Sequence, residues 1–336
     1  MTRRILAAAF VLAFAGFLLV CAWPQLFGLH HAAGIAQIVS LRGAAVAAAI
    51  AGVVVFLLIA LVSVRARRFT ASLALVLIGF VLLNSAVLAS RGLGNTSFET
   101  RGTNDLVVLS WNTLGDAPGA ETIAELALDA GADIITLPET TRDTGVAVAR
   151  IMGAGGKPMW SHTIAYDQIS KARSTTVLIS ADLGTYEVSQ DATTSVLPTV
   201  IATPADGTGP TIIAVHAVAP IPGQMANWRS DLALLAEKCV GDNVIMAGDF
   251  NSTPDHFAGL ALQPEHTIGE CDSSALATNN GAVGTWPSRA PSLLGTPIDH
   301  VMHTTNWRTT GMRVVETHDN YGSDHRPVIA QLSPAG

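Results

Sequence analysis

An acid and an amide stand two positions apart at the end of an apolar run in the sequence N-V-I-M-A-G-D-F-N-S-T-P. The run Val244–Gly248 suits the buried inside of a strand, and Asp249 and Asn251 follow it. Because side chains in a strand alternate between its two faces, both polar groups point the same way if the extended backbone continues. Turn formation is one explanation for these residue types. A site for a metal ion and a phosphate group is the other.

The same arrangement recurs along the C-terminal part of the chain. Each example alone fits a turn former or a packed histidine, but together they form a set of oxygen donors and imidazoles. Carboxylate and amide oxygens suit a hard cation such as Mg²⁺, Mn²⁺ or Ca²⁺, and Asp–His pairs suit acid–base chemistry. The further candidates are Asn112 in V-V-L-S-W-N, Glu139 in D-I-I-T-L-P-E, His216 in T-I-I-A-V-H, Asp299 in T-P-I-D-H-V, and Asp324 and His325 in G-S-D-H-R-P-V.

The elements that must position these side chains alternate between strand-like and helical patterns. Apolar positions recur at helical spacing in Glu121–Ala130 and in Asn227–Lys238. The strand-like runs come partly in adjacent pairs and partly alternate with these helices. This order favours a mixed-sheet α/β domain with two packed sheets over a simple doubly wound one.

Three N-terminal segments are long and apolar enough to cross a bilayer, which takes roughly 20 residues each. They are Ile5–Trp23, Ala44–Val64 and Ala71–Ala89. The first also has the basic start of a signal peptide, but two further spans follow it. We therefore divide the chain into a membrane anchor (1–90), a Gly-, Ser- and Thr-rich linker (91–103) and a C-terminal domain (104–336) that carries the polar candidates.

Positive charge orients the three spans. Arg3 and Arg4 precede the first span and three arginines lie within 65–68, whereas the loop between the first two spans carries only Arg42. Since Lys and Arg concentrate on the cytoplasmic side, the N-terminus is expected in the cytoplasm of a multi-pass membrane protein. Everything after residue 90 is then expected outside the cytoplasm.

The charge and the cysteines of the part after residue 90 limit which functions are expected for it. From residue 104 onwards it carries 11 Lys and Arg residues against 25 Asp and Glu residues. Such an acidic domain is a poor non-specific binder of nucleic acid, which needs clustered positive charge. Cys239 and Cys271 lie in the same part, where an oxidising setting permits a disulfide; two buried free thiols are the equal alternative.

Six short motifs in this order resemble the endonuclease/exonuclease/phosphatase superfamily, which has the DNase I-like fold. They are S-W-N-T, L-P-E-T, V-H-A, G-D-F-N-S, I-D-H-V and S-D-H-R-P-V. The resemblance covers about residues 104–334 and none of the membrane spans. It implies a four-layer sandwich of two mixed β-sheets flanked by helices, with a phosphoesterase site at one edge of the sheets.

The resemblance also implies roles for the matching residues. Glu139 becomes the principal ligand of Mg²⁺ or Mn²⁺, with Ca²⁺ as a further candidate, helped by Asn112, while Asp324 completes the metal and water shell. Among the implied catalytic residues, Asp249 holds or activates the attacking water and Asn251 binds a phosphate oxygen. His216 contacts the phosphate or assists the leaving oxygen. His325 binds the phosphoryl group and is oriented by Asp299. The identity of the general base stays open.

Several other residues near the motifs have weaker signals. Tyr166 and Asp167 are candidates for a mid-chain role that some members of the superfamily fill, and His300 is expected to pack. Trp228, in the segment that follows His216, is expected to pack in a helix. The basic residues that stand near motifs, any of which is a candidate for a second phosphate, are Arg142, Lys171, Arg173 and Arg229.

The substrate class depends on features outside the motifs. The segment H-A-V-A-P-I-P-G-Q-M-A-N-W-R is similar to membrane-anchored actinobacterial members of the superfamily linked with teicoplanin resistance. A short link to the spans keeps the site near lipid head groups, where lipid phosphates are concentrated. We therefore expect a tethered, extracytoplasmic phosphoesterase acting on a lipid-linked or cell-envelope phosphate ester or pyrophosphate. An exported nuclease and a non-catalytic phospho-ligand binding module are the alternatives.

Overall fold

Two sheets of six strands each form the centre of the C-terminal domain in the computed structural model, which describes residues 2–167, 169–189 and 193–335. In each sheet one central pair is parallel, β1 with β2 and β7 with β8, and the other neighbours are antiparallel. The first sheet, in spatial order, comprises β11 (Trp307–Val314), β12 (Val328–Pro334), β1 (Leu106–Ser110), β2 (Ile134–Pro138), β4 (Ser174–Ser180) and β3 (Met159–Ala165). The second comprises β5 (Tyr186–Val188), β6 (Val200–Pro204), β7 (Thr211–His216), β8 (Val244–Asp249), β10 (Asp299–His303) and β9 (Asp272–Ser273).

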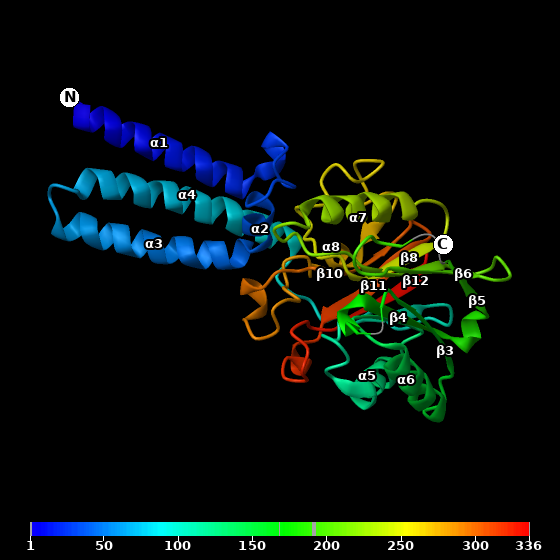
Figure 1. Ribbon diagram of the computed structural model, residues 1–336. Helices are drawn as coiled ribbons and strands as arrows, with labels where there is room; N and C mark the ends of the chain where they lie inside the picture. Colours follow the sequence, from blue (N-terminus) through cyan, green and yellow to red (C-terminus); the bar gives the residue numbers. More distant parts are fainter. Residues whose placement is uncertain (1, 168, 190–192, 336) are drawn as a thin grey trace.

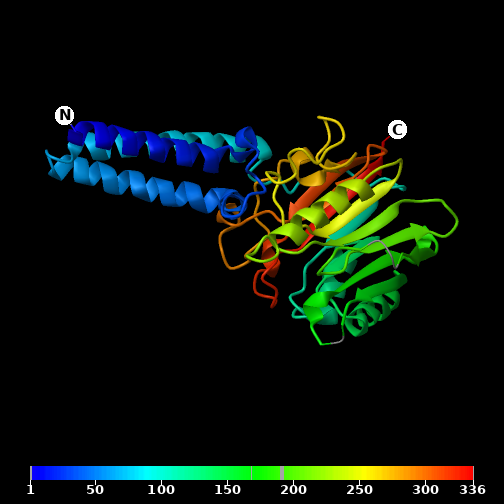
Figure 2. The same ribbon diagram turned by 45° about the horizontal axis from the view of Figure 1, so that its top comes forward.

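Helices cover the outer faces of both sheets, so that the domain has four layers (Figures 1 and 2). Helices α5 (Gly119–Ala130) and α6 (Arg142–Ala154) pack on the first sheet, and α7 (Met225–Lys238) packs on the second. Residues of both inner faces, such as Val108 and Ala247, share one buried cluster between the sheets. The predicted four-layer α/β sandwich is confirmed. A shorter helix, α8 (Ser274–Ala277), precedes β10.

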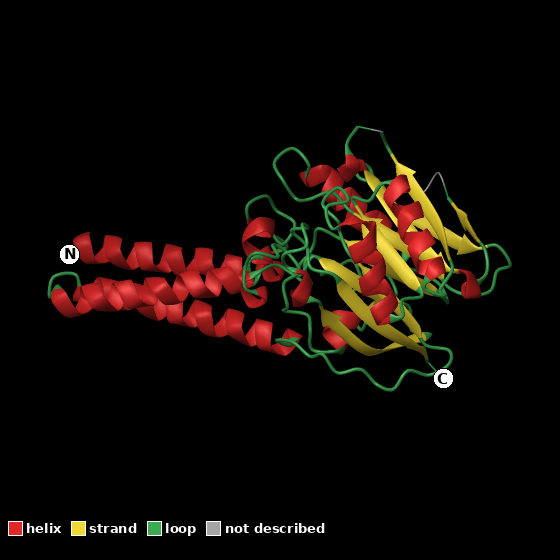
Figure 3. Cartoon of the chain, turned by 90° about the horizontal axis from the view of Figure 1, so that it is seen from below, coloured by secondary structure: helices red, strands yellow, loops and turns green. Residues whose placement is uncertain are grey.

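Three long apolar helices precede the domain and project from one end of it (Figure 3). Each is long and apolar enough to cross a membrane, and only a minority of the residues in each span are buried within the chain. Because these faces are apolar on every side, a bilayer rather than water suits them. The helices are α1 (Thr2–Ala22), α3 (Arg42–Val62) and α4 (Arg67–Arg91), with the short α2 (Ile35–Ser40) between the first two.

The segment 91–103, expected to be a linker, runs along the C-terminal domain and is hydrogen-bonded to it. The Gly94 N–H donates to the Asn279 carbonyl at 2.9 Å, and the Glu99 N–H donates to the Thr310 carbonyl at 2.9 Å. Phe98 forms a bridge with the backbone of β11. The helices and the domain are therefore joined directly, with little free chain between them.

One carboxylate of the domain joins all three long helices to it. Asp255 is 1% exposed and forms ion pairs with Arg42 of α3 at 2.6 Å and with Arg91 of α4 at 2.8 Å. The side chain of Gln25, just after α1, donates to the same carboxylate at 2.9 Å. Asn84 of α4 accepts a hydrogen bond from Arg42. Although burial alone raises the pKa of Asp255, the hydrogen bonds from the two arginines hold it well below its usual range.

Cys239 and Cys271 form a disulfide, with 5.8 Å between their Cα atoms. The bond ties the end of α7 to the residue before β9. Of the two alternatives left open by the sequence, the structure has the disulfide.

Candidate active site

Strand register brings three of the candidate side chains together on the second sheet. His216 at the end of β7 is the register partner of Asp249 at the end of β8, and Asp249 is in turn the partner of Asp299 in β10. Register partners on neighbouring strands lie side by side on one face. Strands β7 and β8 approach each other closely here. This is shown by Gly248, where an added Cβ would lie 2.0 Å from the Val215 carbonyl oxygen.

The first sheet supplies Asn112 and Glu139 from the same edge of the sandwich, because β1 and β2 run in parallel and end together. The Asn112 amide nitrogen donates to Glu139 Oε1 at 3.2 Å and to Asp249 Oδ2 at 3.0 Å. One amide therefore connects the two sheets. Glu139 has a φ of 58° and Asn251 a φ of 45°. Such left-handed conformations are uncommon outside glycine and are typical of functional sites.

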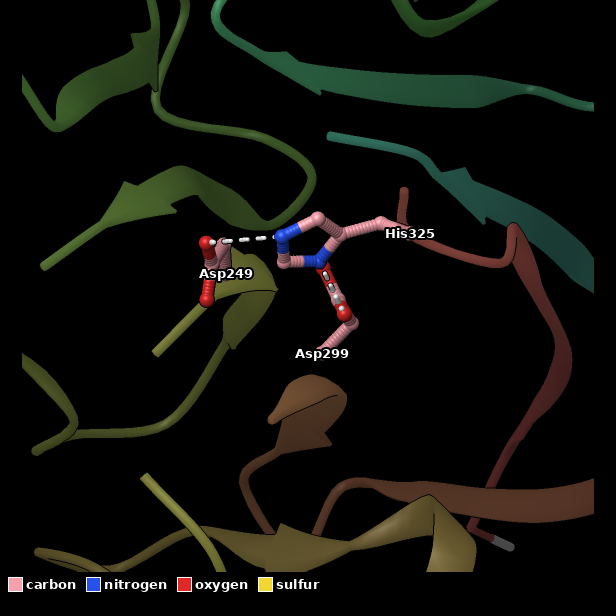
Figure 4. A group of neighbouring side chains, drawn as sticks. All are labelled: Asp249, Asp299 and His325. Carbon is pink, nitrogen blue, oxygen red and sulfur yellow. Dashed lines mark hydrogen bonds and ion pairs between the residues drawn. The ribbon is translucent and has the colours of Figure 1, made fainter. Parts of the chain in front are cut away.

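His325 reaches the same place from the loop before β12, as Figure 4 shows. Its Nδ1 lies 2.8 Å from Oδ2 of Asp299, and its Nε2 lies 3.8 Å from Oδ2 of Asp249. The side chain is 8% exposed. Burial alone lowers the pKa of His325, but the negative charges of Asp299 and Asp249 outweigh burial and raise it to about 10. The ring is therefore a cation with both N–H groups directed at carboxylates.

Burial also shifts the acids of the site. It raises the pKa of Asp249, partly offset by the positive charge of His325, and the nearby Asp299 adds to the rise. Burial likewise raises the pKa of Glu139, against the hydrogen bond from Asn112. A carboxylate with a raised pKa is a better proton acceptor near neutral pH than an exposed one.

The remaining two predicted catalytic residues border this group. The Asn251 amide nitrogen donates to the Ala217 carbonyl at 2.9 Å and to Asp249 Oδ2 at 3.2 Å. His216 Nδ1 lies 3.2 Å from the Thr175 hydroxyl, and burial, together with the charge of His325, lowers the pKa of His216 to about 3. His216 is therefore a neutral ring beside a charged one.

Asp324 is the last of the predicted site residues. Its side chain is held by Trp286, which no sequence motif singles out. Asp324 Oδ1 lies 4.0 Å from His325 Nε2, and Asp324 Oδ2 accepts a hydrogen bond from Trp286 Nε1 at 2.9 Å. All eight predicted site residues thus lie around one place. Ser323 also positions the loop, since its hydroxyl donates to the Asn112 carbonyl at 2.6 Å and accepts from the His325 N–H at 3.0 Å. Ser323 belongs to the S-D-H-R-P-V motif, whereas Trp286 belongs to none.

The charges of the site suit a cation. Four carboxylates, those of Glu139, Asp249, Asp299 and Asp324, surround the single imidazolium of His325. Asp299 Oδ1 and Asp324 Oδ1 are buried and have no hydrogen-bond partner within the described ranges. The ligand atoms of Asp249, Asp299 and His325 lie within 4.8 Å of one another, a spacing that can hold a metal ion.

The weaker candidates lie elsewhere or pack. His300 is buried against Phe250 and Phe257, with Nε2 2.8 Å from the Ser252 carbonyl. Trp228 is fully buried and donates to the Ser252 hydroxyl.

The mid-chain candidates have partners outside the site. Tyr166 bonds to Thr193, and Asp167 pairs with Arg173. Arg229 donates to the carbonyl of His31.

A polar cavity of about 830 Å³ lies beside the start of α6, and its described lining includes none of the eight site residues. Arg142 and Lys171 line it, together with Asp116 and Thr141. Thr141 follows Glu139 by two residues and donates to Asp116. Arg142 and Lys171, two of the predicted candidates for a second phosphate, therefore share this cavity.

Comparison with known families decides the relationship: residues 109–325 match the Endonuclease/Exonuclease/phosphatase family. The chain belongs to this family. The match covers well over half of the chain and contains every site residue described above. The resemblance inferred from the six motifs is confirmed at the level of the family. Comparison with curated proteins gives no match.

Solved structures of the endonuclease/exonuclease/phosphatase fold superimpose on the domain. One is described as an endonuclease/exonuclease/phosphatase from Beutenbergia cavernae, with 17% identity and a TM-score of 0.52, covering 69% of this chain and 72% of that one. Another is humanized D. rerio TDP2, with 15% identity and a TM-score of 0.51, covering 69% of this chain and all of that one. At these identities the likeness concerns the fold.

Proposed function

We propose that this chain is a membrane-anchored, divalent-metal-dependent phosphoester hydrolase whose catalytic domain lies outside the cytoplasm. The observation that carries the proposal is the meeting of Glu139, Asp249, Asp299 and His325 at one edge of the two sheets. The preferred substrate is a phosphate ester or pyrophosphate that is lipid-linked or belongs to the cell envelope.

The metal is assigned to Glu139, with Asn112 and Asp324 beside it. Oxygen ligands suit Mg²⁺ or Mn²⁺, and Glu139 is a half-buried acid without a cationic side chain bonded to it among the described residues. His325 is a weaker ligand candidate, because both of its nitrogens carry protons in the charged form. When bound, the ion neutralises negative charge that develops on the phosphate oxygens.

Side chains of the site bind and orient the phosphate group and the attacking water. The oxygen of a water attacks phosphorus, the bond from phosphorus to the ester oxygen breaks, and that oxygen takes a proton from solvent. Asp249 accepts the proton of the attacking water, since its raised pKa suits that role. The His325 N–H binds a phosphoryl oxygen, with Asp299 fixing the ring. Asn251 and the neutral His216 border the phosphate.

Two features support the extracytoplasmic location. The Cys239–Cys271 disulfide suits an oxidising compartment. The arginines near the N-terminus and between α3 and α4 favour a cytoplasmic position for those two ends of the helices. Three crossings then lead the chain to the other side.

The proposal is tested on the full-length chain in lipid nanodiscs with a panel of phosphate compounds. The panel contains prenyl pyrophosphate, phosphatidic acid, an inositol phosphate and plasmid DNA, each with Mg²⁺ and with EDTA. We expect metal-dependent phosphate release from a lipid compound, and its loss in Glu139→Gln but not in Glu187→Gln, an exposed acid on β5. Cleavage of DNA alone would favour the nuclease, and ligand binding without turnover would favour the binding module.

A further inference from the structure

An apolar groove lies between α3 and α4 where the two helices meet the catalytic domain. Its volume is about 300 Å³. Val46, Ala47 and Ile50 of α3 form one wall, Leu88 of α4 contributes to the other, and Leu293 and Leu294 of the domain lie over them. Ile50 is eight residues into α3, about 12 Å along the helix from Arg42. The groove therefore reaches into the part of the bundle that a bilayer would surround.

The domain residues over the groove belong to a loop that also reaches the active site. Leu293 and Leu294 lie in the short helix Ser292–Leu294, close to Gly43 of α3, where a Cβ would be 1.9 Å from the Leu293 carbonyl oxygen. Trp286 lies on the other arm of the same loop, forms a bridge with Thr296, and donates its N–H to Asp324.

The chain leads from Leu294 to Asp299 in five residues, which span at most about 17 Å. One leaflet of a bilayer has a hydrocarbon thickness of about 15 Å. The groove and the active site are therefore close enough for one lipid molecule to occupy both.

The relative position of groove and site is fixed by the buried ion pairs of Asp255. Asp255 follows Asp249 and Asn251 in one loop, and it binds Arg42 at the start of α3 and Arg91 at the end of α4. The same two helices form the walls of the groove. The two sites are therefore parts of one assembly, in which neither moves far without breaking these bonds.

We propose that this groove binds a hydrocarbon chain of a lipid phosphoester whose phosphate lies in the active site. The inference rests on the proposed function and names its substrate class. The occupant is hydrocarbon because the lining of the groove is apolar apart from Ser85, at the depth of the spans, where a polar group would have few hydrogen-bond partners. The lipid enters sideways from the bilayer, and its head group extends past the loop of Trp286 towards Asp324 and His325.

A second groove in the bundle provides a matched control. It lies between α1 and α4, has a volume of about 260 Å³, and is lined by residues such as Ala15, Leu18 and Gly79. All of its lining residues in the described structure belong to α1 and α4, and none belongs to the C-terminal domain. Both grooves contact bilayer hydrocarbon, but only the first one is covered by the loop that leads to the active site.

The test uses the full-length chain in nanodiscs with phosphatidic acid that carries a photoreactive diazirine in one acyl chain. After irradiation, labelled peptides are mapped by mass spectrometry. We expect label in 46–50 and 293–294 to exceed label in 15–19 and 76–83 about tenfold, and to be displaced by dioleoyl phosphatidic acid more than by dioleoylglycerol. Equal labelling of both grooves, or equal displacement by the two lipids, means that the groove is only solvated by lipid and overturns the proposal.

Filling each groove separately gives a second measurement. Ala47→Phe fills the first groove, and Ala15→Phe is the same substitution in the second. We expect Ala47→Phe alone to lower the label about tenfold and to lower hydrolysis of dioleoyl phosphatidic acid similarly, with dihexanoyl phosphatidic acid hydrolysed as before. If Ala15→Phe has the same effect, the proposal is wrong. Labelling does not need turnover, so Glu139→Gln should keep the label, and specific labelling without hydrolysis of any lipid would count against the proposed function alone.

Discussion

Asp299 and His325 lie 2.8 Å apart across the edge of the sandwich, one in the second sheet and the other in the loop that enters the first. The carboxylate is buried, and it is bonded to the ring nitrogen that faces away from Asp249. The other nitrogen is therefore directed into the site. A pair of this kind fixes the orientation of the ring before any substrate binds.

Removing the charge of Asp299 should reduce activity without unfolding the protein. Asp299→Asn keeps the size of the side chain but weakens the bond that orients His325, so we expect kcat for phosphoester hydrolysis to fall about 100-fold. KM and the melting temperature should change little. The control is Asp182→Asn, which alters an exposed acid in the short helix Ala181–Leu183. A fall in kcat of equal size in the control, or none in Asp299→Asn, would contradict the role of the pair.

Removing the charge of Asp255 should loosen the joint between the helices and the domain. Asp255→Ala leaves Arg42 buried without its partner, a type of change that costs about 3–5 kcal/mol. We expect the variant in nanodiscs to unfold at lower denaturant concentration and to be cut by protease within 92–97 faster than the wild type. The matched control is Glu99→Ala, which breaks an exposed pair with Arg308. Its stability should hardly change, and equal losses in both variants would argue against a structural joint at Asp255.

Low pH should weaken the same contact between the helices and the domain, because His256 becomes protonated. Its Nδ1 accepts a hydrogen bond from the Thr253 N–H at 3.0 Å, and its Nε2 lies 3.2 Å from the Ala36 carbonyl, so the neutral ring fits the site. Burial lowers the pKa of His256 from 6.5 to about 4, against the nearby charge of Asp255 and with help from His31. Since the folded state has the lower pKa, this stability is fully present above pH 6.5 and is lost as pH falls towards 4.

The size of this effect is up to about 3 kcal/mol in the free energy of unfolding. It is measured by denaturant unfolding in nanodiscs at several pH values, in the wild type and in His256→Asn. The variant removes the titrating group, and it should show a weaker dependence on pH between 6.5 and 4. Parallel pH profiles for the two proteins would show that His256 does not contribute.

The disulfide should be present in protein isolated from the membrane without reductant. In denaturant, a maleimide reagent should then label only Cys21, and reductant should raise the count to all three cysteines. Closing a loop of this length stabilises a protein by about 3–4 kcal/mol, so the double variant Cys239→Ser, Cys271→Ser should unfold correspondingly earlier. Labelling of three cysteines before reduction would contradict both the bond and the oxidising location.

Sequence patterns predicted which polar residues come together in the candidate site, because each of them lies at or near the end or the beginning of an apolar strand. Strand ends such as Asn112, Glu139 and Asp249 meet at one edge once the sheets form, and local periodicity is enough to find them. Helix α6 was missed, because its sequence R-D-T-G-V-A-V-A-R-I-M-G-A has two glycines and few large apolar residues. Trp286 was missed because its contact with Asp324 depends on how a long loop folds.

The contact between the helices and the domain could not be predicted from local sequence patterns. The sequence around Arg42 indicates only a charge that orients the spans, and none of the six motifs includes Asp255. The two residues are 213 positions apart, and nothing in the sequence around either one indicates an ion pair. A charged residue at the end of an apolar span is common, so only the packing of the whole chain identifies its partner.

The ion pairs of Asp255 have a consequence for how this protein meets the molecules on which it acts. Asp255 is bonded to α3, to α4 and to Gln25 next to α1, so the loop that carries Asp249 and Asn251 is held in a fixed position relative to the three helices. In the membrane-anchored enzyme proposed above, the pocket would therefore stay at one height above the bilayer. Encounters are then governed by lateral diffusion in two dimensions, and the rate should follow the mole fraction of a lipid in the leaflet more closely than its bulk concentration.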